Sequence, residues 1–374
     1  MSIETGEVQE FAKGFVFGAF AKGGWDWVSM QNIVDWHVNQ KIEFILCLPF
    51  EEKTLKYVKE MLGADENLYW ARAWINPYHT DADLILVVDK LLEVKRIQTA
   101  IDVLHHRVRE GKGLDIERSV TALLSINDST DNANQMSTYD TQELIKALQA
   151  DPNTPEQDLF NVEWRYVQLL DELHGNSPIL LQKKLASEPT FLAELMRLIY
   201  KPSDAGDDYP KPIEEESNIA TNAWRLLQNW KLPPGMKGGI FDVSDFNNWV
   251  EEAKNQARAD KRYEITMQEI GKVFKYYPDA EEGLWLPVQV AEILDANDAE
   301  HIRVGYALEI YNSRGVHTVD PEGKPEMALS EKWKKRAEVA ENEGFPRFGA
   351  KLREVSESYR REAQRNIDEF VNRR

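Results

Sequence analysis

The chain has 374 residues, of which 42% are hydrophobic and 10% aromatic, and this apolar content excludes a chain that is disordered throughout. Sixty-four acidic residues against 45 basic ones give a net charge of −19. Such an excess repels the phosphate backbone, so generic binding to DNA or RNA is disfavoured.

The beginning of the chain predicts neither export nor insertion into a membrane. Glu4, Glu7 and Glu10 precede the first apolar run, where a signal peptide would carry basic residues. No apolar run approaches the roughly 20 residues of a membrane span. The one cysteine, Cys47, excludes an internal disulfide and a zinc site built on cysteines. We therefore expect a cytoplasmic protein.

Tryptophan is frequent near the start of the chain, where Trp25, Trp27 and Trp36 lie close together. Aromatic side chains fill cores and also form the hot spots of protein interfaces. The core is the first interpretation for most of the eleven tryptophans. Trp25 and Trp27 are our candidates for contacting a protein partner.

Apolar residues recur at three- and four-residue steps along most of the chain, as on one face of a helix. Leu84, Val87 and Leu91 show this spacing clearly, and the run 42–48 favours a buried helix. Strand alternation is scarce and a βαβ rhythm is missing, so the sequence predicts an all-α fold. Further apolar stripes lie in 97–108, 155–173, 189–200, 214–230, 242–259, 285–295, 298–312 and 345–371.

Residues 81–109 resemble a single helical hairpin of the tetratricopeptide type. Val88 and Lys95 depart from the pattern because they stand at small or glycine positions, and Arg107 stands where alanine is usual. A second copy at the 34-residue spacing of that family is not found. The resemblance implies degenerate helical repeats. It is carried by Leu84, Val87, Leu91, Ile97, Ala100 and Leu104.

Two stretches interrupt the helical pattern. Residues 125–138 are polar and rich in turn formers, which predicts a mobile loop. Residues 201–216 contain three prolines and a cluster of acids, a composition that resists regular structure. We place a domain boundary in the second stretch. The sequence thus predicts a two-lobed, helical-repeat-like array with lobes at 1–200 and 214–374.

The end of the chain differs in charge from the rest, because residues 330–374 contain twelve basic and nine acidic residues. A basic surface on an acidic body is typical of a solvated helix face, and a docking surface is the alternative. One apolar stripe runs through this segment, and we expect it to pack on the second lobe. It consists of Phe345, Phe348, Leu352, Val355 and Tyr359.

Motifs that would indicate catalysis are missing. Gly111-Lys112-Gly113 lacks the hydroxyl residue and the preceding strand of a phosphate-binding loop. His105 and His106 are adjacent, so on a helix they point about 100° apart and are poorly placed to share a metal ion. A nucleophile elbow is also missing. We therefore predict no catalytic residue, no metal ligand and no cofactor.

Arg314 and His317 flank Gly315 between two predicted helices, and we select both as candidates for contacting a protein partner. The alternative is an ordinary helix exit, where a cation lies near the negative end of the helix.

Several phrases resemble the C-terminal helical region of large bacterial multidomain proteins linked to putative antiphage defence. In those proteins an effector and often an ATPase precede the helical region, so the resemblance implies a region that senses or docks a partner. The phrases are Gly23-Gly24-Trp25-Asp26-Trp27-Val28, Leu48-Pro49-Phe50, Tyr69-Trp70, Asn229-Trp230 with Pro233-Pro234-Gly235, and Arg314-Gly315-Val316-His317.

These observations favour a non-enzymatic, protein-binding helical scaffold or sensor, because a helical array exposes a long surface for recognition. Two alternatives stay open. One is a helical hydrolase with an acidic active site, which would need several acids gathered in a deep cleft. The other is a structural subunit of a homo- or hetero-oligomeric assembly.

Overall fold

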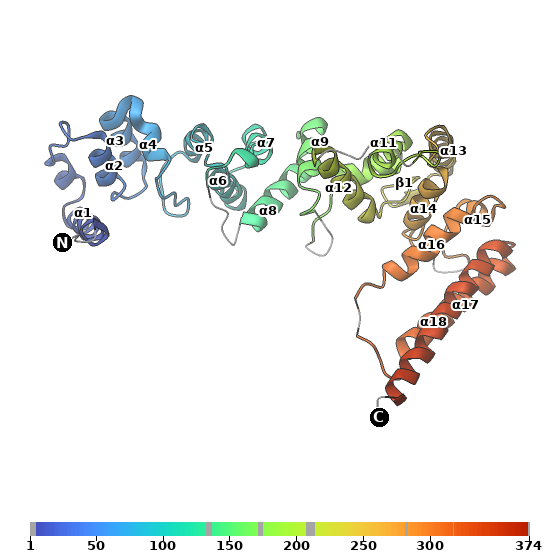
Figure 1. Ribbon diagram of the computed structural model, residues 1–374. Helices are drawn as coiled ribbons and strands as arrows, with labels where there is room; N and C mark the ends of the chain where they lie inside the picture. Colours follow the sequence, from blue (N-terminus) through green and yellow to red (C-terminus); the bar gives the residue numbers. More distant parts are fainter. Residues whose placement is uncertain are drawn as a thin grey trace. The chain divides into compact units, whose positions relative to one another are not determined.

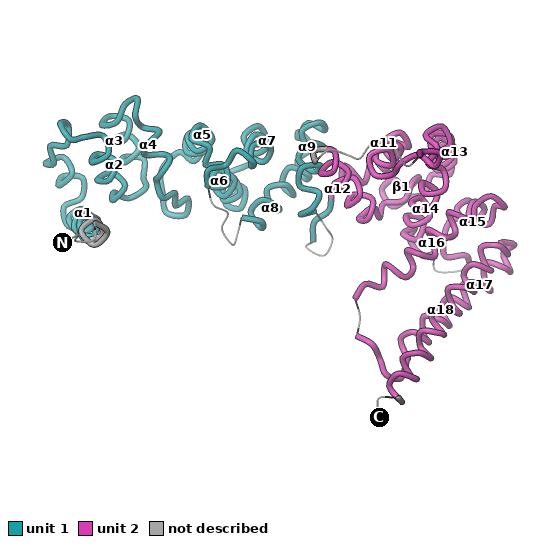
Figure 2. Tube along the Cα trace, viewed as in Figure 1, with its two compact units in different colours: residues 1–177 teal, residues 178–374 magenta. Residues whose placement is uncertain are grey.

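The computed structural model describes residues 5–131, 137–170, 175–206, 214–280, 283–316 and 318–372. Within these ranges the regular secondary structure is helical apart from one short β-hairpin, which confirms the predicted all-α fold (Figure 1). The chain divides into two compact units, residues 1–177 and 178–374 (Figure 2). No described helix is both long enough and apolar enough to cross a membrane.

Helices of unit 1 pack against neighbours that are close in the chain. Helices α5, α7 and α9 form one row, and α6 and α8 lie in a second row against them (Figure 1). The elements are α1 (Thr5–Ser29), α2 (Val38–Ile45), α3 (Glu52–Leu62), the short 3₁₀ helix η1 (Gly63–Asp65), α4 (Glu66–Trp70), α5 (Leu84–Glu93), α6 (Ile97–Arg109), α7 (Ile116–Leu124), η2 (Ile126–Asp128), α8 (Ser137–Ala150) and α9 (Glu156–Arg165).

The segment 81–109 forms the helical hairpin that its apolar spacing predicted. The Asp83 carboxylate accepts a hydrogen bond from the Ile85 amide at 2.9 Å and so caps the start of α5. Lys95 in the turn adopts a left-handed conformation with φ of 60°, which explains why a glycine-like position occurs here. The packing residues Leu84, Val87, Leu91, Ile97, Ala100 and Leu104 are all buried.

Unit 2 contains the remaining elements. These are α10 (Ile179–Ser187), α11 (Pro189–Ile199), α12 (Glu214–Gln228), β1 (Met236–Lys237), β2 (Ile240–Phe241), α13 (Val243–Ala259), α14 (Tyr263–Phe274), α15 (Val288–Asp295), α16 (Glu300–Asn312), α17 (Lys324–Asn342) and α18 (Pro346–Asn372). The strands pair antiparallel, with Met236 opposite Phe241 and Lys237 opposite Ile240. Gly238 and Gly239 in the turn both have positive φ, as a tight hairpin requires.

The long antiparallel pair of α17 and α18 ends unit 2 (Figure 1). Four residues of the predicted stripe, Phe348, Leu352, Val355 and Tyr359, are each at most 1% exposed, so the stripe packs inside this unit. Its first residue, Phe345, is half-buried. Phe348 contacts Trp285 and Tyr306 at ring-centroid distances of 5.8 and 5.3 Å. The terminal helix is therefore part of the core, through α15 and α16 as well as α17.

The boundary between the units lies between Ser177 and Pro178, ahead of the stretch 201–216 in which the sequence placed a domain boundary. The difference has a physical reason, because α11 packs against α12 and α13 on the far side of that stretch. Residues 132–136 and 207–213, within the two predicted irregular segments, lie outside the residues that the structure describes. Within the first of those segments, residues 126–128 form η2.

Candidate protein-binding site

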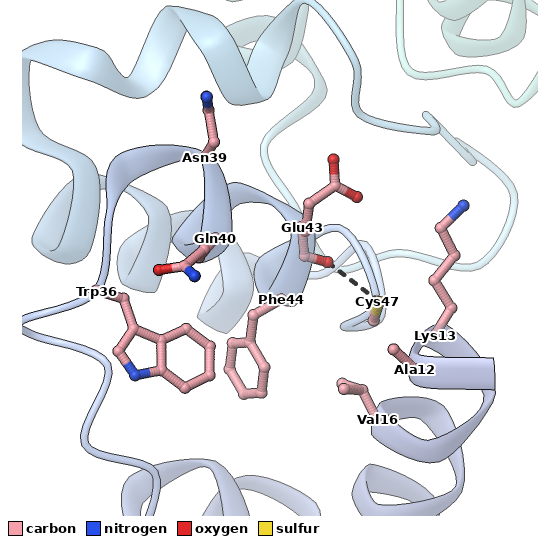
Figure 3. Close-up of a pocket in the computed structure, with 9 residues that line it drawn as sticks. All are labelled: Ala12, Lys13, Val16, Trp36, Asn39, Gln40, Glu43, Phe44 and Cys47. Carbon is pink, nitrogen blue, oxygen red and sulfur yellow. Dashed lines mark hydrogen bonds between the residues drawn. The ribbon is translucent and has the colours of Figure 1, made fainter. Parts of the chain in front are cut away.

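An apolar cavity of about 440 Å³ lies between α1 and α2 in unit 1 (Figure 3). Ala12 and Val16 border it from α1, and Trp36 and Phe44 border it from the segment around α2. The polar side chains of Asn39, Gln40 and Glu43 line it as well, together with Lys13 and Cys47. The cavity thus combines a mainly apolar lining with polar groups beside it.

Two aromatic rings give the cavity its shape. The Trp36 ring meets the Phe44 ring edge-on, with centroids 5.8 Å apart at an angle of 79°. Phe44 is 6% exposed and anchored in the core, whereas Trp36 keeps 41% of its surface in solvent. Trp27 packs on Phe44 at 5.9 Å. Phe44 is therefore a fixed support, and Trp36 is the ring that a bound group can reach.

Helix α1, which borders this cavity through Ala12 and Val16, also exposes large apolar side chains on more than one face. Phe11, Phe15 and Phe17 are 78%, 65% and 70% exposed. A helix that is apolar on all sides normally lies inside a larger core or a partner's surface. At Gly24 the backbone adopts φ of 54° and ψ of −148°, so α1 is kinked there. Because of the kink, the axis of α1 before Gly24 has a different direction from that of the turn Trp25–Ser29.

Trp25, a predicted partner contact, is held by its own chain. Its indole Nε1 donates to Glu51 Oε1 at 2.6 Å, and its ring meets Phe20 and Tyr57 edge-on. Lys53 lies 4.9 Å from the ring centroid. These contacts fix the part of α1 after the kink to α3. They give Trp25 an anchoring role, and its contact with a partner stays a prediction.

Trp27, the second tryptophan selected from the sequence, is half-buried and packs on Phe44, which lines the cavity. Gly23 leaves room for it, because a Cβ atom at Gly23 would lie only 2.6 Å from Trp27 Cβ. Trp27 thus lies close to the cavity without being among the residues that line it.

Cys47 lies at the edge of the cavity and is half-buried. Its thiol donates to the Glu43 carbonyl oxygen at 3.2 Å, as Figure 3 shows. The Glu43 carboxylate in turn forms an ion pair with Arg72. Neighbouring groups therefore hold the polar side of the cavity in place.

Arg314 lies in unit 2 and is engaged inside that unit. Its guanidinium forms ion pairs with the fully buried Glu326 and, at 3.2 Å, with Glu362. These contacts join the end of α16 to α17 and α18. Arg314 is thus part of the packing, while its role in partner binding stays a prediction. His317 lies outside the residues that the structure describes.

Unit 1 also contains a buried histidine next to a carboxylate, a pair of groups that can serve in catalysis. His105 Nδ1 lies 2.7 Å from Asp140 Oδ1, and both side chains are largely buried. Its neighbour His106 packs instead against Tyr78, with ring centroids 4.6 Å apart. Over the described ranges, no group of three or more His, Cys, Asp or Glu residues is arranged to hold a metal ion.

No protein-family model, curated protein sequence or solved structure matches this chain. Sequence reasoning selected Trp25 and Trp27 but missed Trp36. The sequence alone does not show which of these three neighbouring tryptophans is exposed to solvent. The signal that was available is the run Phe11–Phe20, which carries apolar residues on every side of a helix.

Proposed function

We propose that this protein is a non-enzymatic helical scaffold that binds a partner protein, and that its N-terminal cavity receives an apolar helix of that partner. The observation that carries the proposal is the cavity of about 440 Å³, together with the exposed Phe11, Phe15 and Phe17 on the helix that borders it. An amphipathic helix recognises such a site by placing apolar side chains at three- and four-residue steps into the groove.

The surroundings of the cavity support a protein partner. An exposed aromatic ring on a rigid support, such as Trp36 on Phe44, is typical of an interface hot spot. Contiguous exposed apolar surface is uncommon in monomeric proteins unless it is used for binding. The two-row packing of α5 to α9 further favours a degenerate helical repeat, an architecture that often binds proteins.

Site-specific photo-crosslinking tests the proposal. A photoreactive phenylalanine analogue placed at Phe15 should crosslink to one segment of another protein in the native host, mapped by mass spectrometry. The same analogue at Leu308, which is 42% exposed on α16, is the control. Trp36→Ala should weaken binding of the mapped segment at least tenfold. Equal crosslinking at both positions, or a polar unstructured target, contradicts the proposal.

A second candidate is a structural subunit that assembles with copies of itself, and the exposed phenylalanines of α1 favour it as well. In that case the crosslink from Phe15 maps to this same chain. Phe15→Ser then lowers the oligomeric state measured by light scattering. A place in a bacterial defence system is proposed on the sequence resemblance alone, and the identity of the crosslinked partner tests it.

A further inference from the structure

A second cavity, of about 700 Å³, lies in unit 2 where the start of α14 meets the segment that follows α11. Its lining is rich in positive charge, although the chain as a whole carries −19. The lining residues that matter here are four cations, Lys201, Arg258, Lys261 and Arg262, and two tyrosines, Tyr200 and Tyr263.

Main-chain amides add to this positive character. Tyr263, Glu264 and Ile265 form the first turn of α14, and all three line the cavity. Their N–H groups have no acceptor among the residues that the structure describes, and no side chain caps the helix. The start of a helix carries a partial positive charge and free amides, which together bind phosphate groups well.

Arg262 is the independent observation that points to an anion. The residue is only 7% exposed, yet in the described part of the chain no carboxylate forms an ion pair with it. Its Nε donates to the Tyr200 carbonyl at 2.6 Å and its Nη1 to the Asp260 carbonyl at 2.8 Å. Nη2 has no acceptor among the described residues. The two carbonyl oxygens offset only part of the cost of burying this charge, and an anion bound at Nη2 would offset it further.

Acidic side chains neutralise only part of the positive charge of these four cations. Lys261 forms an ion pair with Asp204, and Glu264 lines the cavity with a side chain that is 76% exposed. Arg258 lies over the Tyr263 ring at 4.7 Å. Neither Arg258 nor Lys201 has a carboxylate partner in the described ranges. Three cations thus stay available for a ligand.

We propose that this cavity binds the phosphate group of a phosphorylated small molecule that also carries a flat ring, as a mononucleotide does. The amides of α14 and the Arg262 guanidinium contact the phosphate, and Lys201 and Arg258 surround it. The half-buried tyrosines, Tyr200 and Tyr263, offer ring faces for stacking. The volume falls within the range of small-ligand sites, and the chain's net charge disfavours a nucleic-acid polymer.

Calorimetry on the full chain tests the proposal with AMP, adenosine, inorganic phosphate and a phosphoserine peptide as probes. AMP should bind at least tenfold more tightly than adenosine, and binding should weaken in 0.5 M salt, because charge carries the recognition. AMP should also bind more tightly than phosphate alone, since the ring adds stacking. The proposal is overturned if adenosine or phosphate binds as tightly as AMP. It is also overturned if AMP does not bind at millimolar concentration. A phosphoserine peptide that binds tenfold more tightly than AMP also overturns it, in favour of a protein ligand.

Variants locate the binding. The double substitution Lys201→Gln with Arg258→Gln changes exposed side chains, so the melting curve should be unchanged while AMP binding weakens at least tenfold. Lys334→Gln with Lys335→Gln, two exposed cations on α17, removes the same charge away from the cavity and should leave binding intact. If both double variants bind AMP equally well, the ligand binds elsewhere and the assignment is wrong. Arg262→Gln should abolish binding, but the exposed pair keeps the test valid even if this variant unfolds.

Discussion

Gly271 on α14 and Gly305 on α16 lie where the backbones of these two helices meet. A Cβ atom at Gly271 would lie 2.0 Å from the Ile302 carbonyl oxygen, and one at Gly305 would lie 1.9 Å from the Gln268 carbonyl oxygen. A side chain at either position would therefore clash with the main chain of the other helix. The two glycines set the distance at which α14 packs against α16.

Replacing Gly305 by alanine should destabilise unit 2 strongly, because the methyl group meets rigid backbone rather than a movable side chain. We expect a loss of about 2–3 kcal/mol in the free energy of unfolding, at the upper end for overpacked cores. Urea unfolding followed by circular dichroism measures it. Gly18→Ala on α1 is the matched control, because none of the described atoms lies within 4 Å of a Cβ atom there. It should stabilise its helix by about 0.5–1 kcal/mol. Equal effects would show that the close approach is not needed.

Arg314 offers a way to separate packing from recognition. Arg314→Met leaves the fully buried Glu326 without its guanidinium, which should cost about 3–5 kcal/mol. Adding Glu326→Gln should recover part of this loss, because the buried charge is then removed as well. Thermal melting of the single and double variants measures both effects. If Arg314→Met melts like the wild type but loses a partner, Arg314 is a recognition residue, as its sequence context suggested.

The helices could be predicted from the sequence because their apolar stripes are long and regular, as in Leu84, Val87 and Leu91. Position 95 agrees with the repeat pattern in its backbone conformation. The pattern places a small residue or glycine there, and Lys95 adopts the left-handed conformation that glycine favours. The domain boundary that the sequence places within 201–216 differs from the division of the chain at Ser177 and Pro178. A high content of proline and acids indicates a connection, but it does not show which helices pack across that connection. Helix α11 joins unit 2 through contacts that span the connection.

The candidate sites were harder to predict, because they depend on which side chains are exposed and on which residues distant in sequence lie close together. The cavity beside Trp36 needs α1 to lie near α2, which no local pattern encodes. Likewise, the cations of the second cavity come from two segments about sixty residues apart, 201–203 and 258–265. Tertiary packing brings them together, and their spacing along the chain carries no motif. Arg314 was selected as a loop residue, whereas its partners Glu326 and Glu362 give it an internal role.

His106 predicts a dependence of stability on pH. Burial lowers the pKa of His106 below its ordinary 6.5. Below about pH 6.5 the unfolded chain therefore binds a proton that the folded chain does not, so this contribution to stability is present above pH 6.5 and lost as the pH falls toward the folded pKa. His106→Gln should flatten the fall in unfolding free energy between pH 7 and 5. Tyr78→Ala, which uncovers the His106 ring, should flatten it too. Unchanged slopes in both variants would contradict the assignment.

Limited proteolysis tests the organisation of both units. We expect cleavage within 125–138 and 201–216, because these polar stretches have little surface to bury. Cleavage in 201–216 should not separate the fragments, since α11 packs against α12 and α13 across the cut. Gel filtration of the nicked protein should therefore show one species. Fragments that separate under native conditions would instead support the boundary predicted from the sequence, with lobes at 1–200 and 214–374.

The terminal helix provides the last prediction. Leu352 is fully buried in the stripe that packs α18 against its neighbours, so Leu352→Asp places an unpaired carboxylate in the core. We expect a loss of about 4 kcal/mol or more in unfolding free energy, as for a severe core substitution. Leu308→Asp, at a position 42% exposed, is the control and should change stability by less than about 1 kcal/mol. Thermal melting and light scattering are measured on both variants. An unchanged melting temperature together with lost self-association for Leu352→Asp would mean that the stripe serves an interface between copies rather than the core of unit 2.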